Sequence, residues 1–247
     1  MKYLLYVVLV IGLVALISGC KSDQPTSPVQ AVQQEDGNLR NAHSQTMGTS
    51  SYQSGTNNGY FWSLWKSDGM SGYVTYTNGS GGNYSVSWNC NGNFTCGKGW
   101  SSGSKTRRLG YNCGAYSQSG GGGSFAYYGW CRNPLMEYYV NEKWPGTRPA
   151  SGSSLRTVSS DGGTYNVYTA WRSNAPSIDG TKSFRQIFST RTSKAPSGNR
   201  TITFANHANA WSAAGYGLGS DMSPAAILLT EAWGQSSGYS NATVWNN

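Results

Sequence analysis

Two of the chain's four glutamates lie inside apolar segments, where a carboxyl group is energetically costly. Glu137 lies in segment 134–140 (PLMEYYV) and Glu231 in segment 225–233 (AAILLTEAW), and neither segment contains Lys or Arg. Both segments are typical of buried strands. Because desolvation disfavours the charged form, such a carboxyl group must be neutral, paired or used in chemistry. The other two, Glu35 and Glu142, fall in polar segments.

A pair of carboxyl groups in aromatic surroundings is what glycoside hydrolysis requires, one as an acid and one as a nucleophile or base. The alternation of a strand places Glu137 on the same face as Tyr139, and Glu231 on the same face as Trp233. Aromatic rings on these faces suit the stacking of sugar rings. For either glutamate alone, a structural ion pair is the alternative interpretation.

Other chemistries lack the residues that they need. His207 is the only histidine after residue 50, so neither a metal hydrolase nor a serine triad is expected, and no G-x-S-x-G element is present. We expect a hydrogen-bonded structural role for His207 and no metal or cofactor. The net charge of +8 comes from scattered residues, densest at 105–108, so nucleic acid is not an expected partner.

The N-terminal fifty residues predict export. Residues 1–19 resemble a signal peptide of the lipoprotein type, followed by Cys20 as the site of lipidation; an ordinary signal peptide is the alternative. Residues 20–50 are polar and predict a flexible tether, and residues 51–247 form the expected domain. The prediction is a protein anchored by lipid at the bacterial cell envelope or surface, with plain secretion as the alternative and no other membrane contact.

Four further cysteines follow in the domain. In an exported chain an even number of cysteines suggests disulfides. We expect Cys90 to pair with Cys96 and Cys113 with Cys131, because neighbours on a hairpin meet most easily.

Short alternating segments separated by turn residues fill the rest of the domain. Segment 84–88 (YSVSW) alternates cleanly, and turn signals occur at 78–79, 161–163 and 179–180. Spacings of about 8 to 12 residues between strands predict an all-β sandwich or barrel. One segment, 206–215, predicts a helix that Asn206 caps.

Ordered motifs over most of residues 51–247 carry a resemblance to a known family. They are segments 84–88 (YSVSW), 93–94 (NF), 97–100 (GKGW), 128–130 (YGW), 134–139 (PLMEYY), 174–178 (NAPSI) and 230–231 (TE). In this order they resemble the landmarks of family 11 glycoside hydrolases, the endo-1,4-β-xylanases. The resemblance implies a β-jelly roll of two curved antiparallel sheets with a single helix, acting on xylan or xylo-oligosaccharides. We expect the protein to be a monomer.

The resemblance also implies roles for individual residues. Glu137 would be the nucleophile and Glu231 the acid/base of a retaining mechanism, with Asn93 hydrogen-bonded to Glu231. The residues that would bind sugar or position Glu137 are Trp65, Tyr128, Tyr139, Arg172 and Gln186. Pro176 would lie at the tip of a thumb hairpin that covers the cleft.

One departure from the family pattern lies beside Glu231. Ala225 stands where a sugar-stacking Tyr is common, and Trp233 is the candidate to replace that contact. The alternative function is a non-catalytic carbohydrate-binding module or lectin of the same shape, which has no need of the two carboxyl groups.

Overall fold

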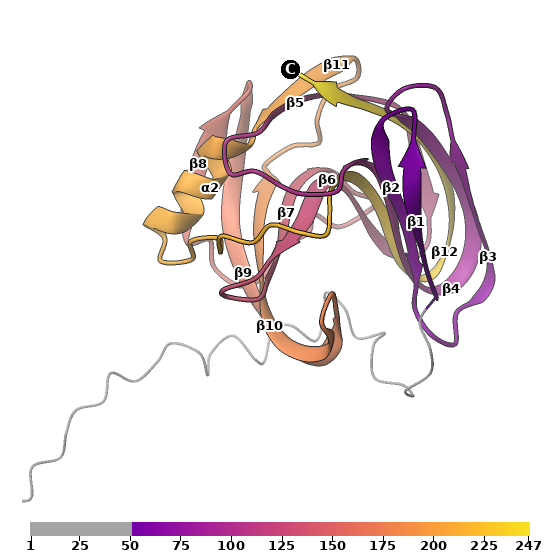
Figure 1. The fold of residues 1–247 in the computed structure, drawn as a ribbon, viewed down its shortest axis with the longest axis horizontal. Coiled ribbons are helices and arrows are strands. Elements are labelled where there is room, and N and C mark those ends of the chain that lie inside the picture. Colours follow the sequence, from indigo (N-terminus) through magenta and orange to yellow (C-terminus); the bar gives the residue numbers. More distant parts are fainter. Residues whose placement is uncertain (1–50) are drawn as a thin grey trace, which may run out of the picture.

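Strands dominate the part of the chain that the structure, a computed structural model, describes, namely residues 51–247. The expected signal peptide 1–19, the lipidation site Cys20 and the tether 20–50 lie outside the described residues. The elements are β1 (Ser51–Asn57), β2 (Tyr60–Lys66), β3 (Ser71–Asn78), β4 (Asn83–Trp100), β5 (Arg108–Ser119), β6 (Gly122–Cys131), β7 (Met136–Lys143), β8 (Arg156–Ser160), β9 (Gly163–Ser177), β10 (Gly180–Arg191), β11 (Asn199–Thr203), α2 (Phe204–Ala213) and β12 (Ala226–Asn246) (Figure 1).

Two long strands, β4 and β12, join two layers of sheet. One layer has the order β1-β2-β4-β12-β6-β7-β10-β9-β8, and in it β12 pairs with β6 through residues 226–233. In the other layer the later part of β12, residues 237–246, pairs with β5, which continues to β11, while β3 pairs with the early part of β4. The expected all-β jelly roll with a single helix is confirmed for the described residues.

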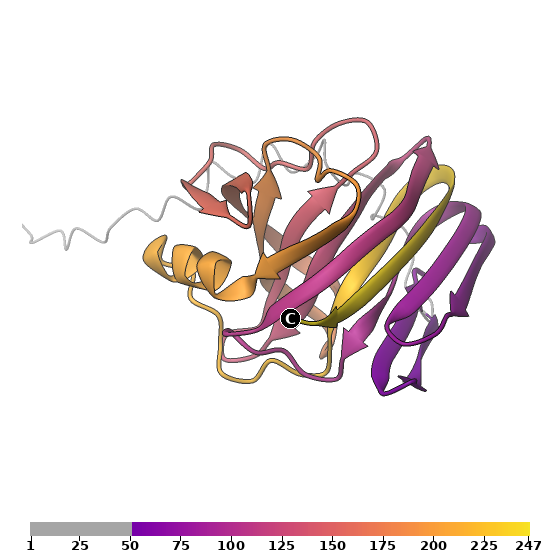
Figure 2. The same cartoon turned by 90° about the horizontal axis from the view of Figure 1, so that it is seen from above.

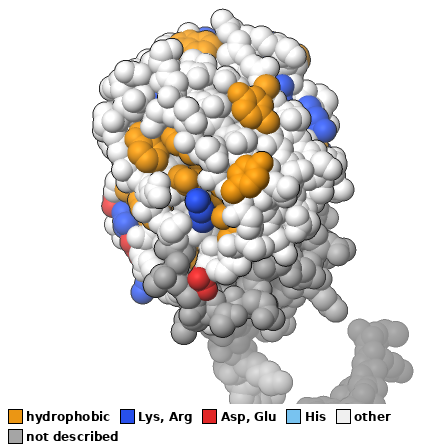
Figure 3. Space-filling view, turned by 90° about the vertical axis from the view of Figure 1, so that its right-hand side faces the viewer, with side chains coloured by type: hydrophobic (Ala, Val, Ile, Leu, Met, Phe, Trp, Pro, Cys, Tyr) orange, Lys and Arg blue, Asp and Glu red, His pale blue; other side chains and the backbone are white. Residues whose placement is uncertain are grey.

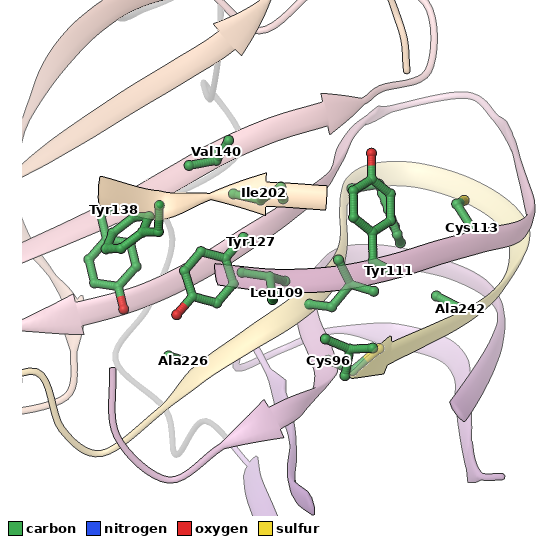
Figure 4. Packing of buried hydrophobic residues seen from close by; sticks show 14 of the residues in the cluster. Cys96, Leu109, Tyr111, Cys113, Tyr127, Tyr138, Val140, Ile202, Ala226 and Ala242 are labelled. Atoms are coloured by element: carbon green, nitrogen blue, oxygen red, sulfur yellow. The ribbon is translucent and has the colours of Figure 1, made fainter. Parts of the chain in front are cut away.

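The core lies between the two layers. Alternation along β4 turns Tyr84, Val86 and Trp88 inward, each at most 1% exposed. They join side chains from both layers, including those that Figure 4 labels on β5, β6, β7, β11 and β12. The packing of these inward faces is what holds the layers together, because burial of apolar area is the main favourable contribution to folding.

Helix α2 packs beside β8 and β5 at one side of the sandwich (Figure 2). Its buried residues, Phe204, His207, Ala208 and Trp211, recur at helical spacing. The helix begins two residues before the expected cap: Thr203 occupies the cap without a side-chain hydrogen bond, and Asn206 lies inside the helix. The prediction of a cap at Asn206 was wrong.

His207 is fully buried, but its expected hydrogen bond is absent. Neither ring nitrogen has a hydrogen-bond partner, and the ring packs edge-on against Tyr165 at 4.7 Å between centroids. Burial lowers the pKa of His207 to about 4, because the charged imidazolium would be desolvated. His207 therefore packs in the core as a neutral imidazole.

Glu142 lies in a buried ion pair, which its polar sequence neighbours did not indicate. The side chain is 1% exposed and accepts a hydrogen bond from Arg191 at 3.1 Å, and the Tyr111 and Tyr165 hydroxyls donate to the same carboxylate at 2.7 and 2.6 Å. Burial raises the pKa of Glu142, with these partners opposing the shift. The partners satisfy the charge, so this glutamate has a structural role.

The predicted disulfides were wrong, since all four cysteines of the domain are free and buried. Cys90 and Cys96 lie on the single strand β4. Six residues along one strand span roughly 20 Å, whereas bridged Cα atoms lie about 4.4–6.8 Å apart. Cys113 on β5 and Cys131 at the end of β6 belong to different layers.

The surface carries few charges for its size. Figure 3 shows a face on which most side chains are uncharged and hydrophobic groups are scattered among them. Among residues 51–247, no helix has the length and apolar character needed to cross a membrane.

Replacing His207 tests its burial as a neutral group. Between pH 6.5 and 4 the unfolded chain binds a proton at His207 that the folded chain does not bind. The free energy of unfolding therefore decreases as the pH is lowered through this window. His207→Leu should reduce that fall by about 3 kcal/mol, measured by urea unfolding at pH 7 and pH 4. An identical loss of stability in both proteins would contradict the assignment.

Candidate active site

Glu137 on β7 and Glu231 on β12, the two glutamates that the sequence pointed to as catalytic candidates, face the same side of the sheet. Strand β6 lies between β7 and β12, with Trp130 opposite Glu137 and Ser124 opposite Glu231. Paired residues in a sheet point to the same side, and Ser124 and Trp130 are an even number of residues apart on β6. Both carboxyl groups therefore project from the face that points away from the core between the layers.

Three donors hold the Glu137 carboxylate, which is 7% exposed. The Tyr128 hydroxyl donates to Glu137 Oε1 at 2.8 Å and the Tyr139 hydroxyl donates to the same oxygen at 2.9 Å. The Gln186 amide donates to Oε2 through a short hydrogen bond. Both carboxylate oxygens are thus engaged by neutral groups, so the carboxylate is fixed in one orientation.

Tyr128 links the two carboxyl groups electrostatically. Burial raises its pKa, and the charges of Glu137 and, more weakly, Glu231 raise it further. The phenol therefore stays protonated as a donor and lies within electrostatic reach of both glutamates. The Trp130 indole donates to the Tyr128 oxygen at 2.6 Å. Sequence reasoning assigned no role to Trp130, although its two-residue offset from Tyr128 indicated a shared face.

Glu231 is 1% exposed and receives a hydrogen bond from Asn93 on the neighbouring strand β4. Asn93 Nδ2 donates to Glu231 Oε1 at 3.3 Å and to the Ala232 carbonyl oxygen at 3.2 Å. The Asn93 backbone amide donates to Ser67 Oγ at 2.9 Å. The structure therefore brings together Asn93 and Glu231, the pair that the resemblance implied, and the buried Asn93 side chain is fixed by backbone contacts.

The sequence-predicted indoles lie on the same face as Glu231. Trp65 on β2 pairs with Thr95, which in turn pairs with Glu231, so Trp65 lies in the same row of the sheet. Trp233 pairs with Gly122 on β6, and its indole lies so close to Gly122 that a Cβ at that position would collide with the ring. Gly122 is therefore needed for the indole to lie against the sheet.

Aromatic and apolar side chains surround the two carboxyl groups. The rings of Tyr139 and Phe188 stack at 5.0 Å between centroids, and Trp130 meets Phe184 edge-on at 4.7 Å. Ala225, where the resemblance leads to a Tyr, packs into the same cluster at 8% exposure. Such a lining keeps the buried carboxyl groups away from bulk water.

A hairpin formed by β9 and β10 carries the remaining predicted residues. Arg172 pairs with Phe184, two residues before Gln186, which places Arg172 on the side of the sheet that carries Glu137. Pro176 pairs with Thr181 near the exposed tip of the hairpin. In Figure 1 this tip curls below the sheet where β9 ends and β10 begins.

The arrangement suits acid/base and nucleophilic chemistry by carboxyl groups. Two buried carboxyl groups share one face, each with a distinct set of neutral donors, and aromatic rings flank them. Among residues 51–247 no group of three or more His, Cys, Asp or Glu residues could hold a metal ion. One carboxyl group can attack or stabilise a reacting carbon while the other moves a proton.

Known proteins are similar in sequence to most of this chain. The profile of glycosyl hydrolases family 11 matches residues 57–243. Endo-1,4-beta-xylanase 3 of Pyricularia oryzae is 46% identical over 191 residues, covering 77% of this chain and 78% of that protein. Endo-1,4-beta-xylanase 2 of Rhizopus oryzae is 46% identical over 195 residues, covering 78% of this chain and 86% of that protein.

A bacterial relative contains the same region within a longer protein. The bifunctional xylanase/xylan deacetylase of Cellvibrio japonicus is 45% identical over 202 residues, covering 79% of this chain and 30% of that protein. With the family match spanning residues 57–243 and this level of identity, the chain belongs to glycosyl hydrolase family 11.

Proposed function

We propose that the chain is an endo-1,4-β-xylanase that hydrolyses internal bonds of xylan with retention of configuration. The observation that carries the proposal is the pair of buried glutamates on one aromatic face, with Glu137 held by three donors and Glu231 by Asn93. The relatives of the chain named xylanases support the same reaction.

Glu137 and Glu231 have separate roles in this reaction. Glu137 attacks the anomeric carbon and forms a glycosyl-enzyme ester while Glu231 gives its proton to the leaving oxygen. Glu231, now a carboxylate, takes a proton from water, whose oxygen attacks the anomeric carbon and releases Glu137. Retention requires carboxyl groups about 5–5.5 Å apart, and no cofactor takes part.

The neighbours of Glu137 orient its attack. Tyr128 and Tyr139 bind one carboxylate oxygen and Gln186 binds the other, which leaves little rotational freedom. Holding a nucleophile in its reactive orientation lowers the entropic part of the barrier. We assign the same three residues to contacts with the sugar at the point of cleavage.

Residues farther along the face bind the rest of the xylan chain. Trp65 and Trp233 present indole faces for stacking on xylose rings, with Trp233 in place of the Tyr that Ala225 replaces. Arg172 hydrogen-bonds sugar hydroxyls, and Pro176 covers the substrate as part of the hairpin tip. A polymer of sugar rings matches the aromatic and apolar groups that line this face.

A non-catalytic binding module or lectin is less favoured. A binding module gains nothing from two carboxyl groups buried beside donors, since their burial is costly. The relatives at 46% identity are named endo-1,4-beta-xylanases, a name for a catalyst. Binding of xylan without any cleavage would favour this alternative.

We also propose that the protein is exported and acts as a monomer. Residues 1–19 would direct export, Cys20 would carry the lipid, and residues 20–50 would tether the catalytic domain 51–247 to the bacterial envelope. If the signal is an ordinary one, the enzyme is secreted instead. Labelling with a radioactive fatty acid separates the two, since a lipid-anchored enzyme should take up the label and the Cys20→Ser variant should not.

Removing each glutamate should give different losses. Glu137→Ala should abolish hydrolysis of both xylan and an activated aryl xyloside, because no nucleophile remains. Glu231→Ala should lower kcat on xylan by roughly 10²–10⁴-fold but retain measurable formation of the glycosyl-enzyme from the aryl xyloside, whose leaving group needs no proton. Steady-state and burst kinetics measure both effects.

The third buried glutamate of the described chain offers a matched control. Glu142→Gln breaks the ion pair with Arg191, so it should lower the melting temperature but leave kcat of the folded enzyme within about threefold. Hydrolysis of xylan at the wild-type rate by the Glu137→Ala and Glu231→Ala variants would contradict the proposed function.

Asn93 should set the pH dependence of activity. Its amide donates to Glu231 at any pH, whereas an aspartic acid at this position donates only when protonated. Asn93→Asp should therefore move the pH optimum of kcat/KM downward, measured on xylo-oligosaccharides. Asn89→Asp, the same change at an exposed position of β4, serves as the control and should leave the optimum in place. An unchanged pH optimum in the Asn93→Asp variant would contradict the role of Asn93 in setting the pH dependence.

A further inference from the structure

Arg132 occupies the junction between β6 and β7, the strand that carries Glu137. It follows β6 directly and precedes the turn into β7, and its backbone forms an isolated bridge with Asp221. Asp221 lies in the segment that leads from α2 to β12, the strand that carries Glu231. The position of Arg132 is thus fixed relative to both catalytic strands.

The guanidinium of Arg132 contacts two segments at once. Its Nε donates to both Asp179 carboxylate oxygens at 2.9 and 3.1 Å, and Nη2 donates to Oδ1 at 2.7 Å. On the other edge, Nη1 donates to Asp221 Oδ2 and to the Ser223 carbonyl oxygen, both at 3.2 Å. A planar guanidinium suits such a bidentate contact, which a lysine could not reproduce.

Asp179 is the outermost part of the β9–β10 hairpin. The turn is braced internally: Ser177 Oγ accepts a hydrogen bond from the Asp179 amide at 3.1 Å and donates to the Gly180 carbonyl oxygen at 2.6 Å. These hydrogen bonds tie residues 177–180 together as a turn. The hydrogen bonds from Arg132 hold the pKa of Asp179 below its ordinary value, so the carboxylate stays charged in neutral and mildly acidic solution.

The hairpin also contains an irregularity where the tip joins its base. The pairing of β9 and β10 shifts register between Lys182 and Phe184, and on the opposite strand Asn174 adopts a positive φ of 48°. The Asn174 backbone amide donates to Ser183 Oγ instead of to the ladder. A bulge of this kind is a natural place for a hairpin to bend.

We propose that Arg132 is a positioning residue that latches the hairpin tip in its closed position over the substrate, through the ion pair with Asp179. The proposal rests on the proposed xylanase function. Because both partners are about one-third exposed, the ion pair is weak and sensitive to salt. A weak latch lets the tip bend at the bulge to admit an internal stretch of polymer and then close on it.

Removing the carboxylate of Asp179 tests the latch. Asp179→Asn in the whole chain should raise KM for neutral xylohexaose about two- to fivefold without lowering kcat, because closure then lacks the ion pair. Sodium chloride at 1 M should raise wild-type KM toward the value of the variant and leave the variant unchanged, since screening acts only on the intact pair.

Two further variants separate a latch from a purely structural contact. Asp68→Asn makes the same change in the turn between β2 and β3, distant from the hairpin in strand order, and should keep wild-type KM and its salt dependence. Arg132→Lys keeps the charge but loses the fork, so its KM should lie between those of wild type and Asp179→Asn.

Unchanged KM and salt dependence in Asp179→Asn, with an active wild type, would overturn the latch while leaving the proposed function intact. A fall in melting temperature and kcat at constant KM would equally overturn it, because it would show a structural role. A wild type that cleaves no xylohexaose would remove the proposed function and the latch together.

Discussion

Burial of two carboxyl groups on one face of a sheet is the constraint on which the site depends. Each group loses its hydration, and the structure replaces that hydration with directed donors: two phenols and an amide for Glu137, and Asn93 for Glu231. Uncharged groups donate to both oxygens of Glu137 and to Oε1 of Glu231 without neutralising the carboxyl groups, so these remain able to attack or to exchange a proton.

The two-layer architecture makes this arrangement possible. Strand alternation sends one set of side chains into the core between the layers and the other set to the catalytic face. The long strand β12 contributes to both the catalytic face and the core. It carries Glu231 in one layer, and in the other layer it carries Ala242 and Val244, which pack in the core. The positions of the catalytic groups are therefore tied to the packing of the whole domain.

Local pattern predicted much of the site but little of the charge pairing. Alternation identified Glu137 with Tyr139, and the family resemblance indicated Asn93 beside Glu231. The burial of Glu142 was missed because its partner Arg191 lies 49 residues away on another strand. The disulfides were mispredicted because cysteines close in sequence were expected to meet across a hairpin, whereas β4 continues through both Cys90 and Cys96. Pairing of this kind depends on register between distant strands, which no local pattern contains.

The central claim is that Glu137 and Glu231 cleave xylan by double displacement. Proton NMR of the first products released from a xylo-oligosaccharide tests it most directly, because the anomeric proton signals appear before mutarotation. Two successive displacements at the anomeric carbon predict the β-anomer as the first product. The α-anomer, appearing first, would show a single displacement by water and would contradict the role of Glu137 as nucleophile.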